Sequence, residues 1–207
     1  PVVVSLASAV FFSLLLVQPA LGQVQGGDRV RDRVRRHAAG LDFLDQTLRT
    51  PEQVERVHTN AYRHWLEDME PAEGRVPLTE ADTLMNPGSL AASARGAGGL
   101  CFAVEQVLGG NAPNAFVATR PPGHHAESNQ AMGFCYFNNV AIGARYLQQE
   151  YDVEKVCIID FDVHHGNGTQ HIFDTDNTVF YYSIHEHPSF AYPGTGREFE
   201  TGFSTGE

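Results

Sequence analysis

The sequence is short of positive charge. It contains 14 Lys and Arg residues against 25 Asp and Glu residues, a formal net charge of −11 over 207 residues. A surface that binds nucleic acids needs clustered Lys and Arg, because contacts with phosphates supply most of the non-specific affinity. We therefore expect no direct nucleic-acid partner.

Cysteine is also scarce. Cys101, Cys135 and Cys157 are odd in number, far apart and without a Cys-x-x-Cys pair, which excludes a disulfide scaffold and a cysteine-based zinc site. Any bound metal must then be held by His and carboxylate side chains. Histidine, by contrast, is concentrated, because seven of the ten His residues fall between His124 and His187.

The most apolar stretch, residues 2–17, is shorter than the roughly 20 residues of a membrane-spanning helix. Pro19 and a small-residue triplet at 20–22 follow it, and the whole resembles the core and cleavage site of a signal peptide. We predict a separate segment at residues 1–28, with a membrane anchor, a buried strand or a gene-model artefact as alternatives. If residues 1–28 are a signal peptide, we expect the protein to be exported. If they are an artefact of the gene model, we expect it to be cytoplasmic.

The rest of the chain, residues 29–207, has the composition of one globular domain, and 42% of all residues are hydrophobic. In its first part, apolar residues recur at intervals of three and four, which predicts helices. The predicted helices cover residues 29–48, 51–57, 62–69 and 89–108. A loop is predicted at 70–87, and Gly109 ends the last helix.

Beyond Asn111 the pattern changes to alternating strands and helices. Strands are predicted at residues 115–119, 155–160 and 178–184, and helices at 138–150 and 168–173. This alternation indicates an α/β fold, a mainly parallel sheet covered by helices on both faces, in three layers. Ligands bind beyond the carboxyl ends of such strands, where polar clusters at 120–125 and 160–167 lie.

The later of these clusters carries ionisable side chains at every second residue. In extended chain Asp160, Asp162 and His164 point to one side, with Phe161 and Val163 on the other. Two carboxylates at the end of an apolar strand are costly unless a cation compensates them. Carboxylate and imidazole ligands suit a zinc ion. The alternative is an ordinary surface turn rich in Asp and His.

The earlier cluster ends in a histidine pair. Arg120-Pro121-Pro122-Gly123 leads into His124 and His125, with the prolines fixing the backbone and the glycine allowing a sharp turn. Imidazoles beside a metal site can act as general base and acid near neutral pH. A lone His pair is more often plain polar structure, but this one follows a neighbouring strand end.

Four ordered blocks together resemble the zinc-dependent histone deacetylase family, which shares its fold with acetylpolyamine amidohydrolases and arginases. The blocks are residues 120–126, 133–139, 160–168 and 192–196. The resemblance spans about residues 50–207 and is closest to the class II-like and bacterial branch. It implies a zinc amidohydrolase that removes acetyl groups from lysine side chains, in which a zinc-bound water attacks the amide.

The resemblance assigns a role to each residue of the polar clusters. It implies Asp162 and His164 as zinc ligands, and His125 as the general base with His124 as its electrostatic partner. Asp160 would orient His124, and Asn167 would orient His125.

Further residues of the blocks would shape the surroundings of this site. The resemblance implies that Gly133, Phe134 and Tyr192 wall a narrow channel for the acyl-lysine side chain. It also implies a structural potassium site from main-chain carbonyls of Asp160, Asp162 and His164 with Ser183.

Two parts of the family's machinery have no counterpart in the sequence. The third zinc ligand, an aspartate, and the catalytic tyrosine or histidine would lie beyond Glu207. The chain starts at Pro1, its end is glycine-rich, and the family's first strand and His-Pro-Glu segment do not match residues 1–28. We therefore expect a domain truncated at its C-terminus, poorly folded and nearly inactive by itself.

Three other functions remain open. An acetylpolyamine or other small acylamide hydrolase would share every motif quoted. An arginase-like two-manganese enzyme would need aspartates where Pro122, Gly123 and Ala126 stand. A non-catalytic metal-binding or interaction module is the alternative from a different class.

Overall fold

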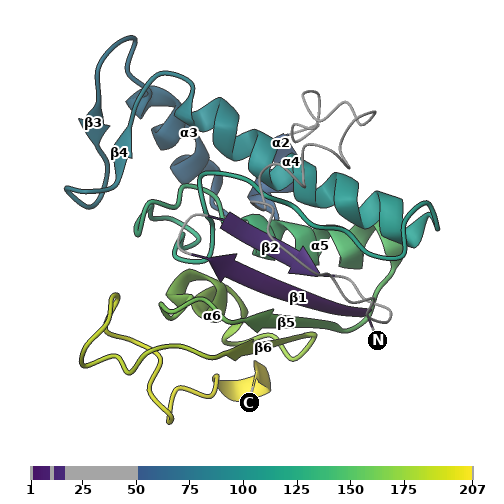
Figure 1. Cartoon of the computed structure of the whole chain (residues 1–207). Helices are drawn as coiled ribbons and strands as arrows, with labels where there is room; N and C mark the ends of the chain where they lie inside the picture. Colours follow the sequence, from purple (N-terminus) through teal and green to yellow (C-terminus); the bar gives the residue numbers. More distant parts are fainter. Residues whose placement is uncertain (1, 10–11, 17–50, 207) are drawn as a thin grey trace, which may run out of the picture.

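The computed structural model describes residues 2–9, 12–16 and 51–206, and Figure 1 shows their arrangement. The predicted helix at 29–48 lies outside these residues. The main sheet has the strand order β2-β1-β5-β6. Its strands are β1 (Val2–Ala9), β2 (Phe12–Leu16), β5 (Val156–Asp160) and β6 (Val179–Ser183). In this sheet β5 runs parallel to both β1 and β6, and β1 runs antiparallel to β2. The predicted α/β class is confirmed, whereas the cover of helices on both faces, in three layers, stays a prediction.

The segment predicted to be signal-like forms two strands of this sheet. In the β1–β5 register Leu6 lies opposite Asp160. A strand, one of the alternatives for this segment, is thus what the structure shows, and the signal function stays a prediction. Among the described residues, no helix is long and apolar enough to cross a membrane.

Helices lie together over one side of the sheet (Figure 1). The described α-helices are α2 (Pro51–Glu55), α3 (Asn60–Met69), α4 (Ser89–Leu108), α5 (Asn139–Tyr151) and α6 (Asn167–Phe173). Helix α4 has the predicted bounds, and it packs on α5. The contact is close because Gly143 leaves room for Leu100, whose Cδ2 a Cβ would approach to 2.6 Å. Helix α5 in turn contacts β5, which joins these helices and the sheet in one core.

Two predictions about the irregular parts were wrong. Residues 115–119 form no strand, and β5 already pairs with β1 on one side and β6 on the other, so this apolar segment has no place beside β5. The predicted loop at 70–87 contains a small antiparallel hairpin, β3 (Val76–Pro77) and β4 (Leu84–Met85). A 3₁₀ turn at Ser204–Gly206 is the last described element.

Strand β6 differs from β5 in how much of it is covered. Ile158 on β5 is fully buried, whereas Phe180 and Tyr182 on β6 are 64% and 51% exposed. A hollow of about 580 Å³ lies against β6, with residues 196–202 on its other side. Within the described part of the chain, the core is therefore on the α4–α5 side of the sheet.

Candidate active site

The end of β5 presents its polar residues to one side, as the alternation predicts. Asp160 and Asp162 are 2% and 3% exposed, whereas Phe161 and Val163 between and after them are 45% and 44% exposed. Main-chain N–H groups stabilise the turn, since Asp162 N donates to Asp160 Oδ1 at 3.1 Å and His164 N donates to Asp162 Oδ1 at 2.8 Å. The carboxylates are thereby held inward by the backbone that follows the strand.

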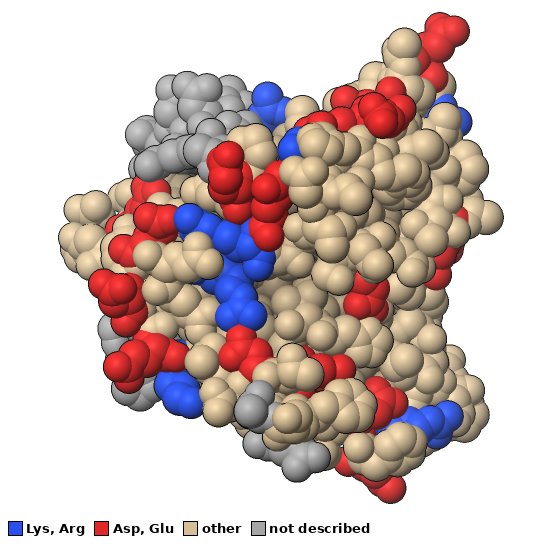
Figure 2. All heavy atoms as spheres, turned by 180° about the vertical axis from the view of Figure 1, so that it is seen from behind, with Lys and Arg blue, Asp and Glu red and all other residues tan. Residues whose placement is uncertain are grey.

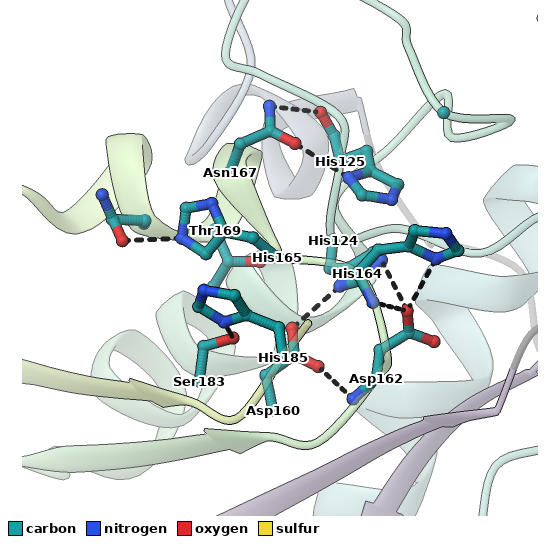
Figure 3. A network of polar contacts seen from close by, with 12 residues as sticks. His124, His125, Asp160, Asp162, His164, His165, Asn167, Thr169, Ser183 and His185 are labelled. Carbon is teal, nitrogen blue, oxygen red and sulfur yellow. Dashed lines mark hydrogen bonds and ion pairs between the residues drawn. The ribbon is translucent and has the colours of Figure 1, made fainter. Parts of the chain in front are cut away.

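The histidine pair approaches these carboxylates from the neighbouring loop (Figure 3). The ring centroids of His124 and His125 are 4.0 Å apart, and both side chains are buried. The turn before them requires glycine, because a Cβ at Gly123 would lie 2.6 Å from the main-chain nitrogen of Asn139. Close packing on the start of α5 thus fixes where the pair lies.

The two histidines have different hydrogen-bond partners. His124 Nδ1 lies 2.8 Å from Asp160 Oδ2, and His125 Nδ1 lies 2.8 Å from Asn167 Oδ1. The amide of Asn167 is oriented by Glu127, because its Nδ2 donates to Glu127 Oε1 at 2.6 Å. An amide oxygen only accepts, so Nδ1 of His125 carries the ring proton and Nε2 keeps a free lone pair.

These partners drive the two pKa values apart. Burial alone would lower the pKa of His124, but the Asp160 carboxylate outweighs it and raises that pKa above its ordinary value. Burial, followed by repulsion from His124, lowers the pKa of His125 to about 3. Burial would raise the pKa of Asp160, but the attraction of His124 lowers it. The site therefore favours a charged His124–Asp160 pair beside a neutral His125.

Asp162 and His164 offer two donor atoms to a metal. Asp162 Oδ1 and His164 Nδ1 are 3.1 Å apart, near the roughly 3.3 Å that separates two ligands of a tetrahedral ion with bonds of about 2.0 Å. Within residues 51–206, no group of three or more His, Cys, Asp or Glu side chains is arranged to hold a metal. The donor set thus fits zinc in kind and supplies two of the three or four protein ligands that zinc sites use.

The predicted potassium residues lie close together. Ser183 on β6 is opposite Asp160 in the sheet register. The Asp160 carbonyl accepts from the main-chain nitrogen of Ile184 at 2.8 Å, and Ser183 Oγ lies 2.7 Å from His185 Nδ1. Potassium binding at this point stays a prediction.

The predicted channel residues lie around the histidine pair. The backbone turns sharply at Gly133 and Phe134, which have positive φ values of 57° and 63°. A side chain at Gly133 would overlap the His125 ring. The rings of Tyr192 and His125 are nearly perpendicular, with centroids 4.9 Å apart. The structure therefore places Gly133 and Tyr192 next to His125, and their role in a substrate channel stays a prediction.

Sequence reasoning missed His58, which is 1% exposed and binds main-chain groups near the site. Its ring is held by two main-chain groups: Nδ1 donates to the Glu127 carbonyl and Nε2 accepts from Asn138 N, each at 2.9 Å. Burial lowers the pKa of His58 to about 4. No local pattern reveals this residue, because its partners lie 69 and 80 residues later.

Glu127 and Glu80 were also missed as contributors. Glu127, which directly follows the block at 120–126, received no role, yet it fixes Asn167 and lies 2.8 Å from His171 Nδ1. Glu80 comes from the β3–β4 hairpin and contacts two channel residues.

Comparisons with known proteins converge on one family. The family model described as "Histone deacetylase domain" matches residues 28–207. "Histone deacetylase 4" of Caenorhabditis briggsae is 49% identical over 192 residues, which cover 83% of this chain and 22% of that protein. A "Probable deacetylase" of Methanothermobacter thermautotrophicus is 36% identical over 184 residues, 87% of this chain and 54% of that protein.

A solved structure matches as well. The crystal structure of the HDA15 HD domain superposes with a TM-score of 0.77 at 33% identity, covering 86% of this chain and 50% of that one. The chain thus spans about half or less of the length of the relatives it matches.

Proposed function

The chain belongs to the histone deacetylase domain family, and on that premise we propose that its protein is a zinc-dependent lysine deacetylase. The observation that carries the proposal is the pair of adjacent buried imidazoles beside Asp162 and His164, one bonded to the carboxylate of Asp160 and the other to the amide of Asn167. Two neighbouring imidazoles with such different partners can divide the tasks of proton acceptor and charge stabiliser. Hydrolysis of an amide needs both tasks.

His125 acts as the general base in this proposal. Its Nδ1–H is committed to Asn167, so Nε2 is the atom that takes a proton from the attacking water. The same atom then returns a proton to the leaving lysine amine. The charged His124–Asp160 pair stays in place and stabilises negative charge that develops on the acyl group.

Asp162 and His164 would hold the zinc ion. When bound, zinc supplies Lewis acidity, which lowers the pKa of water and polarises the amide carbonyl. We propose that the third ligand and the tyrosine or histidine that stabilises the oxyanion belong to parts of the protein outside these 207 residues. The chain alone is then expected to be nearly inactive.

The substrate would reach His125 between Phe134 and Tyr192. Phe134 is 55% exposed and turns outward beside Gly133, whereas Tyr192 faces the histidine pair. We propose an acetylated lysine of a protein or peptide as substrate. An acetylated polyamine fits the same chemistry, and a structural potassium ion near Asp160 and Ser183 belongs to the same proposal.

Figure 2 bears on the choice of partner. On the face that it shows, Lys and Arg form one larger central area with Asp and Glu beside it, and several small separate areas. Arg56, Arg63 and Arg145 are engaged in ion pairs with carboxylates. This supports a protein or small-molecule substrate without direct nucleic-acid contact.

The test is an assay of the purified full-length protein on an acetyl-lysine peptide and on N-acetylputrescine, before and after removal of zinc by a chelator. We expect zinc-dependent release of acetate, faster from the peptide. Preference for N-acetylputrescine would make the protein a small-acylamide hydrolase. No release from either substrate, with zinc shown to be bound, would make the domain a non-catalytic metal-binding module and would contradict the proposal.

A further inference from the structure

The turn of the β3–β4 hairpin contacts both walls of the proposed channel. Glu80 Oε2 accepts from the main-chain nitrogen of Gly133 at 2.9 Å and from the Tyr192 hydroxyl at 2.9 Å. Glu80 Oε1 lies 3.2 Å from the same hydroxyl. One carboxylate thus joins two segments that are 53 and 112 residues away from it in the sequence.

The same hairpin also holds the next residue of the first wall. Thr83 Oγ1, which belongs to a fully buried side chain, accepts from the main-chain nitrogen of Phe134 at 3.2 Å. Phe134 has a φ of 63°, a conformation that costs free energy for a residue with a side chain and persists only where surrounding contacts hold it. Two successive N–H groups of this turn therefore depend on the hairpin.

Tyr192 depends on the hairpin in a different way. Its ring is nearly perpendicular to that of His125, and its ring centroid is 6.3 Å from that of His164. The hydroxyl makes its hydrogen bonds to Glu80. Burial and the Glu80 carboxylate raise the pKa of Tyr192, so this hydroxyl stays protonated and donates. The bond fixes the distance of the ring from the opposite wall.

We propose that Glu80 is a positioning residue that sets the width of the channel, and with it the size of the acyl group that the site accepts. The inference rests on the proposed function and deepens it. Among the described residues, Glu80 forms no ion pair with Lys or Arg. A hydrogen-bonding role and a charge role can therefore be separated by substitution.

The test compares three variants with the wild type, each as zinc-loaded full-length protein, on acetyl-lysine and hexanoyl-lysine peptides of one sequence. Glu80→Ala should raise KM for the acetyl peptide about tenfold with kcat within about twofold, and shift preference about tenfold toward hexanoyl. Tyr192→Phe should shift preference in the same direction. The double variant should show no more than the larger single effect, because both break one bond.

Two further variants provide the controls. Glu80→Gln keeps an acceptor oxygen without the charge and should retain the wild-type preference. Asp82→Asn removes a charge from an exposed carboxylate of the same turn and should change neither kinetic constant. Additive single effects, or a Glu80→Gln variant that behaves like Glu80→Ala, would overturn the inference.

A measurement without catalysis separates this inference from the proposed function. Hydrogen exchange of the zinc-free protein should be about tenfold faster in Glu80→Ala than in wild type for the peptide that contains Gly133 and Phe134. Unchanged exchange would show that the carboxylate does not hold the wall, even in an active enzyme. If exchange were faster but no variant deacetylated either peptide, Glu80 would still be shown to hold the Gly133–Phe134 wall. The proposed function would then be contradicted, and with it the selection of the acyl group.

Discussion

The five inner side chains of the site and the two aromatic walls differ sharply in burial. The inner side chains are only 2–5% exposed, whereas Phe134 and Tyr192 are 55% and 38% exposed. The inner set comprises His124, His125, Asp160, Asp162 and Asn167. It is held by core packing and by buried hydrogen bonds to one another, while the walls are held by a surface hairpin.

Because of this difference, we expect substitutions in the two parts of the site to have different effects. We call the buried inner side chains the inner half and the aromatic walls with their hairpin the outer half. A change in the inner half disturbs charge and proton positions, so it should act on kcat or on folding. A change in the outer half leaves those positions intact and alters the fit of the substrate, so it should act on KM.

The largest effect is expected from removal of the general base. His125→Ala in the full-length protein should lower kcat for an acetyl-lysine peptide about 10³-fold, because no other free imidazole nitrogen lies in its place. His64→Ala, on the exposed face of α3, is the matched control and should retain full activity. A wild-type kcat in the His125→Ala variant would contradict the proposed mechanism.

The next effect concerns the packing that places the inner half. A Cβ at Gly168 would overlap the main-chain carbonyl of Ala126, directly after the histidine pair. Gly168→Ala should therefore reduce the free energy of unfolding by about 3 kcal/mol, measured by urea denaturation. Gly99→Ala, on α4 with ordinary contact to Val117 Cγ1 at 3.6 Å, should stabilise the protein by up to about 1 kcal/mol. Equal effects of both changes would argue against close packing at α6.

The third effect is a dependence of stability on pH through His58. Its pKa is about 4 in the fold against 6.5 ordinarily, so the unfolded chain binds the proton more readily. The contribution of neutral His58 to the free energy of unfolding is fully present above pH 6.5. It is lost as the pH falls toward 4, in total on the order of 3 kcal/mol. Urea denaturation from pH 4 to 8 should show this loss.

A variant separates His58 from the other titrating groups. His58→Gln should be less stable at pH 7, and its stability should change less between pH 6.5 and 4. The surface variant His64→Gln should follow the wild-type profile. If His58→Gln followed it too, the acid sensitivity would come from other residues.

The smallest effect is expected at the outer half. Thr83→Val removes the acceptor of the Phe134 N–H while keeping the shape of the buried side chain. We expect a loss of about 1 kcal/mol in unfolding free energy and a few-fold higher KM at unchanged kcat. A fall in kcat with unchanged KM would contradict the separation of the two halves.

The sequence predicted best what depends on local pattern. Helix α4 ends where Gly109 and Gly110 stop it, and the alternation after Asp160 correctly places the carboxylates on one side. The family blocks brought His124 and Asn167 to attention, and the structure places each in a hydrogen bond with its expected partner.

What the sequence did not predict depends on long-range contacts. His58 and Glu80 lie in no motif, and their partners are more than 50 residues away. Strands β3 and β4 have two residues each, too few for any periodicity to appear. The apolar residues 115–119 do have a strand pattern, but a strand forms only where tertiary contacts give it a neighbour, and both sides of β5 are already paired.

The exposed side of β6 bears on how this chain behaves at high concentration. In the described part of the sheet β6 is an edge strand, and Phe180, Tyr182 and Ile184 are more than half exposed along it. An edge strand with large apolar side chains is a template on which further chains can pair. Solutions of the 207-residue chain should therefore self-associate through β6, and a lysine at position 180 would be the first substitution to try against it.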